Sequence, residues 1–194
     1  MIPALFFLFC VVALRAATGL LIHSGAGAWL SNFAPLAAIT LCCGAFFPRR
    51  YKFALPLGML FLSDLILDLT YHAAPFDPQI LCRYLALAVI GLIGFALRKN
   101  ATWKTMLPAS AVASVIFYGI TNVFSWLTDP GYVKNFGGLF QALTTGLPEY
   151  SATPSWMFFR NSLVSDLVFT AVFMLLMRVQ SPRTSAELAA AGAA

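Results

Sequence analysis

Six long apolar segments constrain this sequence more than any other feature. They cover residues 2–22, 33–47, 53–69, 80–97, 106–127 and 158–177. A helix needs about 20 predominantly apolar residues, with a range of about 17–25, to cross a bilayer. The second segment is short and, taken alone, also fits a re-entrant segment. Only 10% of the residues are charged, against roughly 25% in a soluble domain, so the sequence predicts an integral membrane protein.

The apolar segments are unbroken, whereas a transmembrane β-barrel shows alternating segments of about ten residues. The predicted fold class is therefore an all-α integral membrane protein with six transmembrane helices. The first segment lacks a basic start and contains Arg15, so we expect a retained span and not a cleaved signal peptide. Residues 1–183 are expected to form one domain, and the Ala-rich residues 184–194 a flexible cytoplasmic tail.

Basic residues are distributed unevenly among the connections between segments. Eight of the twelve Lys and Arg residues lie in 48–52, in 98–104 and after the sixth segment, whereas the other three connections contain only Lys134. Cytoplasmic loops carry the excess of Lys and Arg. We therefore predict cytoplasmic termini, external connections 23–32, 70–79 and 128–157, and a multi-pass location in the cytoplasmic (inner) membrane. The net charge of +5 reflects this bias, so no nucleic-acid partner is expected.

The third external connection, 128–157, has 30 residues and is rich in Gly, Pro and aromatic residues. A loop of this length is usually functional or disordered, and the aromatic residues argue against disorder. The alternative is that these rings only anchor the chain at the level of the lipid headgroups.

Polar side chains gather in the predicted outer halves of the spans. At 1.5 Å per helical residue, they lie within roughly 12 Å of the outer boundary; they are Arg15, Asp64, Asp68, Cys82, Arg83, Tyr84, Asn122, Arg160, Asn161 and Asp166. Ionisable groups inside spans usually face the bundle interior or a water-filled cavity. The pattern predicts a polar cavity that opens outward. The alternative is a structural ion pair of Arg15 with Asp64 or Asp166.

Asp64 and Asp68 are four residues apart, on one helix face, so a cation or a donor-rich ligand is expected beside them. One alternative function is therefore a small-ion or proton carrier that uses Asp64, Asp68 and Asp166. His23 and His72 lie at the predicted outer face. Each is interpreted either as a ligand contact or as an ordinary residue of the membrane–water interface.

Cys82 differs from the other three cysteines, Cys10, Cys42 and Cys43, which are interpreted as small packing residues. It lies at the start of a helix and beside Arg83, and both features favour the thiolate, a ligand for soft metals. The alternatives are a fourth packing cysteine and the nucleophile or redox thiol of an intramembrane enzyme. No zinc-ligand spacing, Walker motif, GxSxG, HExxH or Rossmann fingerprint is present, so no free metal is expected.

Several strings, read with the six short spans, resemble the substrate-binding S-components of energy-coupling-factor vitamin transporters. They are NFAPLAA at 32–38, FLSD at 61–64, TNVFSWL at 121–127, GLP at 146–148 and FRNSLVSDL at 159–167. Within that family, the cysteine at the outer start of the fourth span is similar to the one in BtuM-like cobalamin transporters.

The resemblance implies uptake of cobalamin (vitamin B12), with Cys82 as the ligand of its cobalt and with removal of cyanide from cyanocobalamin as an accompanying reaction. The expected substrate-binding residues are Cys82, Arg83, Tyr84, Asp68, Asn122, Arg160 and His23. The resemblance also implies either solitary transport or a coupling subunit that docks on the small residues Ala13 and Ala17 of the first helix.

Overall fold

The computed structural model describes the backbone of residues 2–23, 30–48, 51, 53–71 and 78–180, and the side chains of these residues except 2–8, 23, 67–71 and 178–180. The described residues form helices and no strand: α1 (Ile2–His23), α2 (Leu36–Phe46), α3 (Ala54–Tyr71), α4 (Pro78–Leu97), the short 3-10 helix η2 (Arg98–Asn100), α5 (Trp103–Thr128), α6 (Phe136–Leu143) and α7 (Ser155–Gln180). The all-helical prediction is therefore confirmed. The predicted tail and His72 lie outside the described residues.

Three helices are long and apolar enough to cross a membrane: Pro78–Asn100, Trp103–Thr128 and Ser155–Met177. The apolar stretches described in the other three predicted spans are shorter: Phe9–Ile22, Leu36–Phe46 and Ala54–Ile66. By length and composition, the chain is a helical membrane protein with three candidate spans among its described residues.

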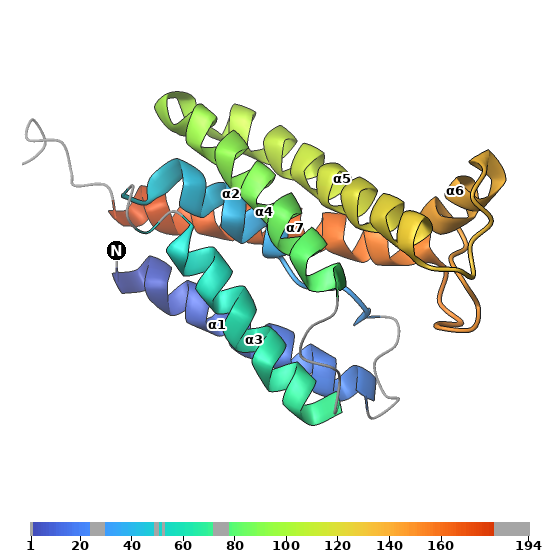
Figure 1. Ribbon diagram of the computed structural model, residues 1–194. Coiled ribbons are helices and arrows are strands. Elements are labelled where there is room, and N and C mark those ends of the chain that lie inside the picture. The colour runs from blue at the N-terminus through green and yellow to red at the C-terminus, as the bar shows by residue number, and fades with distance from the viewer. Residues whose placement is uncertain (1, 24–29, 49–50, 52, 72–77, 181–194) are drawn as a thin grey trace, which may run out of the picture.

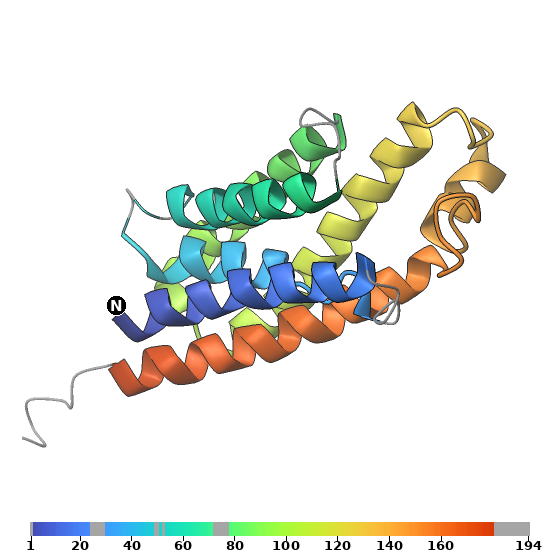
Figure 2. The same ribbon diagram turned by 90° about the horizontal axis from the view of Figure 1, so that it is seen from below.

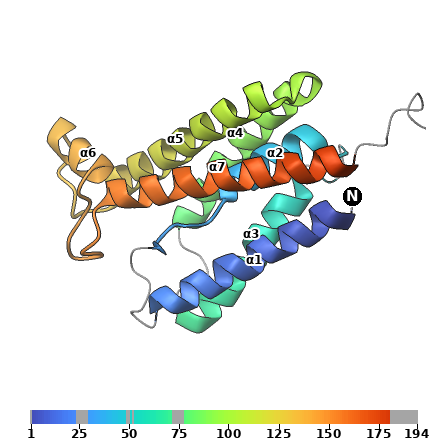
Figure 3. The same cartoon turned by 180° about the vertical axis from the view of Figure 1, so that it is seen from behind.

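The helices are arranged around α2, which packs against α4, α5 and α7. α1 and α3 lie side by side as a separate pair along one flank of this group (Figures 1 and 3). The pair contacts the rest of the bundle mainly where α3 meets α2 and where α1 meets α7. At one end of the bundle α5 and α7 diverge, and α6 lies between them (Figure 2).

Small residues allow α2 to lie deep in the bundle. Every residue from Ala37 to Ala45 is buried. A Cβ atom at Gly44 would overlap the Gly91 carbonyl of α4, and one at Gly94 would overlap the Leu41 carbonyl of α2. Such close backbone contact is a common way for helices to associate in membranes. α2 has 11 residues and ends before Pro48, which disfavours a helical conformation of the C-cap residue Phe47.

The cysteines of the bundle have different environments. Cys42 and Cys43 are buried in the core of α2, as packing residues are expected to be. Cys10 is exposed on α1, so the interpretation of Cys10 as a packing residue is wrong. The apolar run around Cys10 does not reveal which side of the helix faces the protein.

The connection 128–157 contains a helix that the sequence does not indicate. Asn135 caps α6 by accepting a hydrogen bond from the backbone of Gly138 at 2.9 Å. Gly138 packs directly on the Val133 carbonyl, and the Tyr118 hydroxyl of α5 donates to the Leu143 carbonyl at 2.9 Å. These contacts fix α6 against α5 (Figure 1).

Candidate functional site: a polar cavity beside a buried charge cluster

Arg15 of α1 and Asp64 of α3 form a buried ion pair, with 2.6 Å between the Arg15 Nη2 and the Asp64 Oδ1 atoms. Their side chains are 11% and 8% exposed. Arg15 also donates to the hydroxyl of Ser63, which in turn donates to the Leu60 carbonyl at 2.8 Å. Of the two partners that depth leaves open for Arg15, the structure selects Asp64, because α1 packs along α3.

Arg83 of α4 approaches the same carboxylate from the other side. Its Nη2 atom lies 3.6 Å from the Asp64 Oδ2 atom, and its side chain is 31% exposed. Neither this Oδ2 nor the buried Nε atom of Arg83 has a hydrogen-bond partner among the described residues. We call Arg15, Asp64 and Arg83 the charge cluster; it links the α1–α3 pair to α4.

A cavity of about 230 Å³ adjoins the charge cluster. It is lined by side chains from α1, α4, α5 and α7 and from the segment before α2: Arg15, Asn32, Ala34, Leu36, Gln79, Arg83, Phe117, Thr121 and Ser162. The cavity lies in the half of the bundle that contains the beginnings of α4 and α7 and the end of α5. Of the polar residues from which the sequence predicts an outward-opening cavity, Arg15 and Arg83 line this one.

The wall before α2 is held by two neighbouring side chains of α7. The Asn161 amide donates to the Ser31 carbonyl at 2.9 Å, and the Ser162 hydroxyl donates to the Asn32 carbonyl at 3.1 Å. Asn32 has a φ of 60°, in the left-handed region that asparagine tolerates better than most residues. This turn directs the chain from the cavity into α2.

Cys82 lies beside the cavity but is not among the residues that line it. Its side chain is 4% exposed, and its Sγ atom donates to the Ile120 carbonyl of α5 at 3.7 Å. Gln79 and Arg83 face the cavity from the same helix. Adjacent helical residues point about 100° apart, so a position next to Arg83 does not bring the thiol to the same face. A carbonyl oxygen is a partner that suits the protonated thiol, whereas the sequence predicts the thiolate.

The other expected binding residues are dispersed. Tyr84 packs against the apolar core, and the Asn122 amide donates to the Tyr118 carbonyl of its own helix at 2.9 Å. Arg160 donates to the Asn161 side chain, and its guanidinium lies 5.8 Å from the centre of the Trp156 ring. None of the three lines the cavity. The side chains of Asp68 and His23 lie outside the described residues.

Asp166 has a structural role that the sequence does not reveal. Its carboxylate accepts hydrogen bonds from the backbone of Ala38 at 2.9 Å and from the Ser114 hydroxyl at 2.7 Å. Ala38 lies in the first turn of α2, whose N-cap residue, Pro35, makes no side-chain cap. Asp166 therefore caps α2 from α7 and also binds α5. Asp64, by contrast, is paired with Arg15 and keeps an Oδ2 atom without a hydrogen-bond partner among the described residues.

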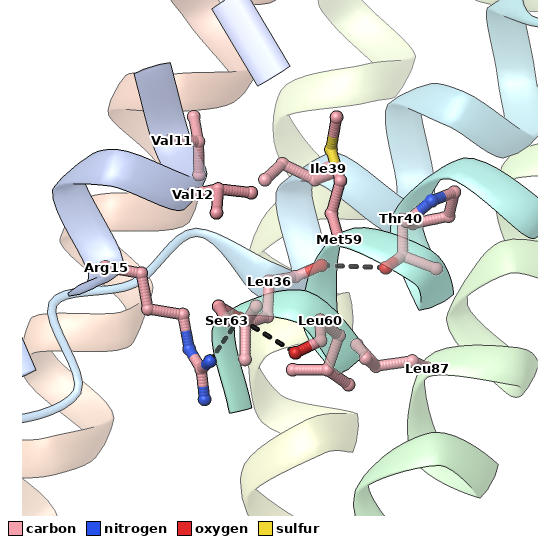
Figure 4. Close-up of a pocket in the computed structure, with 11 residues that line it drawn as sticks. Val11, Val12, Arg15, Leu36, Ile39, Thr40, Met59, Leu60, Ser63 and Leu87 are labelled. Carbon is pink, nitrogen blue, oxygen red and sulfur yellow. Dashed lines mark hydrogen bonds between the residues drawn. The ribbon is translucent and has the colours of Figure 1, made fainter. Parts of the chain in front are cut away.

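A second, much smaller cavity of about 10 Å³ lies between α1, α2, α3 and α4 (Figure 4). Its lining is mostly apolar and includes Val12, Met59 and Leu87. It has room for about one water molecule. Arg15 and Leu36 line both cavities, so both cavities lie along the boundary between the α1–α3 pair and the rest of the bundle.

Four polar lining residues were not expected from the sequence: Asn32, Gln79, Thr121 and Ser162. Gln79 lies four residues before Arg83, so the helical repeat does place the two on one face of α4. The residues at 32, 121 and 162 lie within the strings that carry the family resemblance. Neutral polar side chains near helix ends are common, so they give little signal of their own.

Among the described residues, no group of three or more His, Cys, Asp or Glu side chains is placed to hold a metal ion. In the described part of the chain, the hydrogen-bond partner of Cys82 is the Ile120 carbonyl.

The chain belongs to a family of unknown function (DUF6580), whose model matches residues 1–188. Comparison with curated proteins found no match, and neither did comparison with solved structures.

Proposed function

We propose that this member of the DUF6580 family is the substrate-binding protein of an uptake system in the cytoplasmic (inner) membrane, of the energy-coupling-factor S-component type, and that its substrate is a cobalamin. The observation that carries the proposal is the polar cavity, which is built from four helices and the segment before α2. Polar residues inside a membrane bundle are costly unless they serve a ligand, an ion or a partner helix. Here they meet at one end of the bundle.

The proposed topology has six spans, with both termini in the cytoplasm and the cavity open to the outside. The basic connections support it, and α4, α5 and α7 are long and apolar enough to span. In a Cys10→Ser background, Glu149→Cys should react with a membrane-impermeant thiol reagent in intact cells. Lys99→Cys should react only after the cells are broken. Both positions are exposed, and the reverse labelling pattern would refute the orientation.

Cobalamin binding requires the cavity to widen. Drug-sized ligands occupy about 300–1,000 Å³, and cobalamin is larger than these, whereas the cavity has about 230 Å³. The α1–α3 pair has few contacts with the other helices outside α2 and α7, and the smaller cavity lies along the same boundary. We therefore propose that this pair moves away from α4 to admit the corrin ring.

Cys82 is the proposed cobalt ligand. One weak contact with the Ile120 carbonyl holds its Sγ atom, and Thr121, the next residue of α5, lines the cavity. A shift of α5 that opens this contact would expose the thiol to the substrate while Arg83 still faces the cavity. With cyanocobalamin the sulfur replaces cyanide on cobalt, and cyanide leaves with the thiol proton as HCN. The cobalt oxidation state does not change.

The test is a titration of the purified protein with cyanocobalamin, followed by visible absorption. Wild type should shift the spectrum as cyanide is displaced. Cys82→Ser should remove the shift, because a hydroxyl is a much poorer ligand for a soft metal. Cys43→Ser, at another buried thiol of the bundle, is the matched control and should behave like wild type. A shift that persists in Cys82→Ser would refute the cobalt-ligand role, and no binding to wild type would refute cobalamin as substrate.

Ala13 and Ala17 are exposed on one face of α1, which supports the proposed docking of a coupling subunit there. Ala13→Leu should then abolish transport and leave cobalamin binding unchanged. Transport that survives this substitution would favour the solitary mode.

A further inference from the structure

The described side chains that line the cavity carry positive charge and no negative charge. Two of them are guanidinium groups, Arg15 and Arg83, and none is a carboxylate. The nearest described carboxylate, Asp64, belongs to the charge cluster and is 8% exposed at its side chain. One carboxylate balances one of the two guanidinium groups, so the described part of the cavity has an excess of one positive charge.

The two arginines differ in how far their hydrogen bonds are satisfied. Arg15 makes a 2.6 Å bond to the Asp64 Oδ1 atom and a second bond to Ser63. Arg83 stays 3.6 Å from the Oδ2 atom, too far for a hydrogen bond, and its buried Nε atom has no partner among the described residues. Asp64 therefore holds Arg83 by charge alone and leaves its donors available.

An unsatisfied guanidinium is matched to one kind of ligand. Its planar set of N–H donors binds carboxylate and phosphate oxygens in pairs. The surroundings strengthen such a contact, because the effective dielectric constant inside a protein is far lower than in water. Gln79, one helical turn before Arg83, also lines the cavity and carries an amide, so neutral polar groups flank the site.

We infer that the cavity binds an anionic oxygen group of its substrate and that Arg83 is the residue that binds it. The inference uses the cavity of the proposed function; for cobalamin the group is the phosphodiester that joins the nucleotide to the corrin side chain. A bound anion competes with Asp64 for Arg83. Binding therefore weakens the only ion pair described between α3 and α4 and favours the separation of the α1–α3 pair that a large substrate needs.

The first experiment compares cobalamin with cobinamide, which has the same corrin ring but lacks the phosphodiester and the nucleotide base. A hydrogen bond to a charged group contributes about 1.5–3 kcal/mol. Arg83→Gln should therefore weaken cobalamin binding relative to cobinamide binding by about 10-fold to 100-fold. Arg98→Gln removes an exposed guanidinium outside the cavity and should bind both ligands like wild type. Equal losses for the two ligands, or no loss, would overturn the role of Arg83.

A second experiment separates this inference from the cobalamin proposal. The thermal stability of the purified protein is measured with dimethyl phosphate, which is an anion, and with trimethyl phosphate, its neutral counterpart. Dimethyl phosphate alone should raise the Tm of wild type and of Arg98→Gln, and should not raise that of Arg83→Gln. If this holds and wild type binds no corrinoid, cobalamin is wrong and the anion site stands. If dimethyl phosphate has no effect on wild type, or the same effect on Arg83→Gln, the anion site is refuted.

Discussion

Replacing Asp64 by Asn is expected to be the most destabilising single change in the charge cluster. The carboxylate is 8% exposed and lies 2.6 Å from Arg15 and 3.6 Å from Arg83. Asn keeps the shape of the side chain but removes its charge. The two guanidinium groups would then face each other without the one described carboxylate that lies between them.

The structure ranks three substitutions at the cluster. Two unit charges 4 Å apart interact by about 4 kcal/mol at an effective dielectric constant of 20, and breaking a buried pair costs about 3–5 kcal/mol. Asp64→Asn should cost about 4 kcal/mol, because it affects two guanidinium groups. Arg15→Met should lie near 3 kcal/mol, because Arg83 still compensates Asp64. Arg83→Met should cost about 1 kcal/mol or less, because its 31% exposed group has no hydrogen bond to lose.

The double variant Arg15→Met/Asp64→Asn tests whether the pair itself is responsible. It leaves no uncompensated member of the pair, so its cost should fall below the sum of the single variants by about 2 kcal/mol. The assay is reversible unfolding of the purified protein in mixed detergent micelles, with loss of helical circular dichroism as the signal. A cost equal to the sum, or an Arg15→Met variant as stable as Arg83→Met, would refute the reasoning.

Two further predictions concern the outer segment. Gly138→Ala should destabilise the docking of α6 by about 1–3 kcal/mol, because its Cβ would overlap the Val133 carbonyl. The control Gly119→Ala should not lower the Tm, because no atom lies within 4 Å of the new Cβ. Equal Tm losses in the two variants would contradict this. Burial and the nearby Asp129 carboxylate raise the pKa of Tyr132 in the folded protein. The contribution of the neutral Tyr132 side chain to the stability of the fold is therefore complete below the unfolded pKa of about 10. It is lost as pH rises through the higher folded pKa. Tyr132→Phe should therefore lose less stability than wild type between neutral pH and the range above pH 10, as measured by Tm; parallel pH curves would exclude this contribution.

The helices themselves are largely readable from the sequence. The predicted segment 106–127 corresponds to α5 (Trp103–Thr128), and 80–97 corresponds to α4, which begins at Pro78. Continuous apolar runs define such helices, and proline is well suited to a first helical position. The exception is α6. It has eight residues, including two glycines, and local propensity does not predict a helix that owes its position to contacts with α5.

The site is less readable than the helices, because it depends on which way each side chain points. Depth alone leaves Asp64 and Asp166 as equal partners for Arg15, and only the packing of α1 on α3 distinguishes them. The same limit applies to Cys82. The sequence places Cys82 near the start of α4, next to Arg83. The helical rotation between neighbouring residues, however, directs its thiol to α5 while Arg83 faces the cavity.

Asp166 offers a test of whether the central carboxylate serves transport of protons or the architecture of α2. It is 2% exposed and accepts one bond from the first turn of α2 and one from Ser114. Asp166→Asn keeps an acceptor for the Ala38 N–H and loses the attraction between a negative charge and the start of a helix, which contributes about 0.3–2 kcal/mol.

Asp166→Leu leaves both buried donors unpaired, at about 1–3 kcal/mol for each. Thermal unfolding should therefore rank wild type above Asp166→Asn and Asp166→Leu well below both. Substrate binding by Asp166→Asn should match wild type, because the carboxylate does not line the cavity. If Asn and Leu destabilise equally, the cap is not what Asp166 provides. If Asp166→Asn is stable but abolishes uptake driven by a proton gradient, the proton-carrier alternative is favoured over the cap.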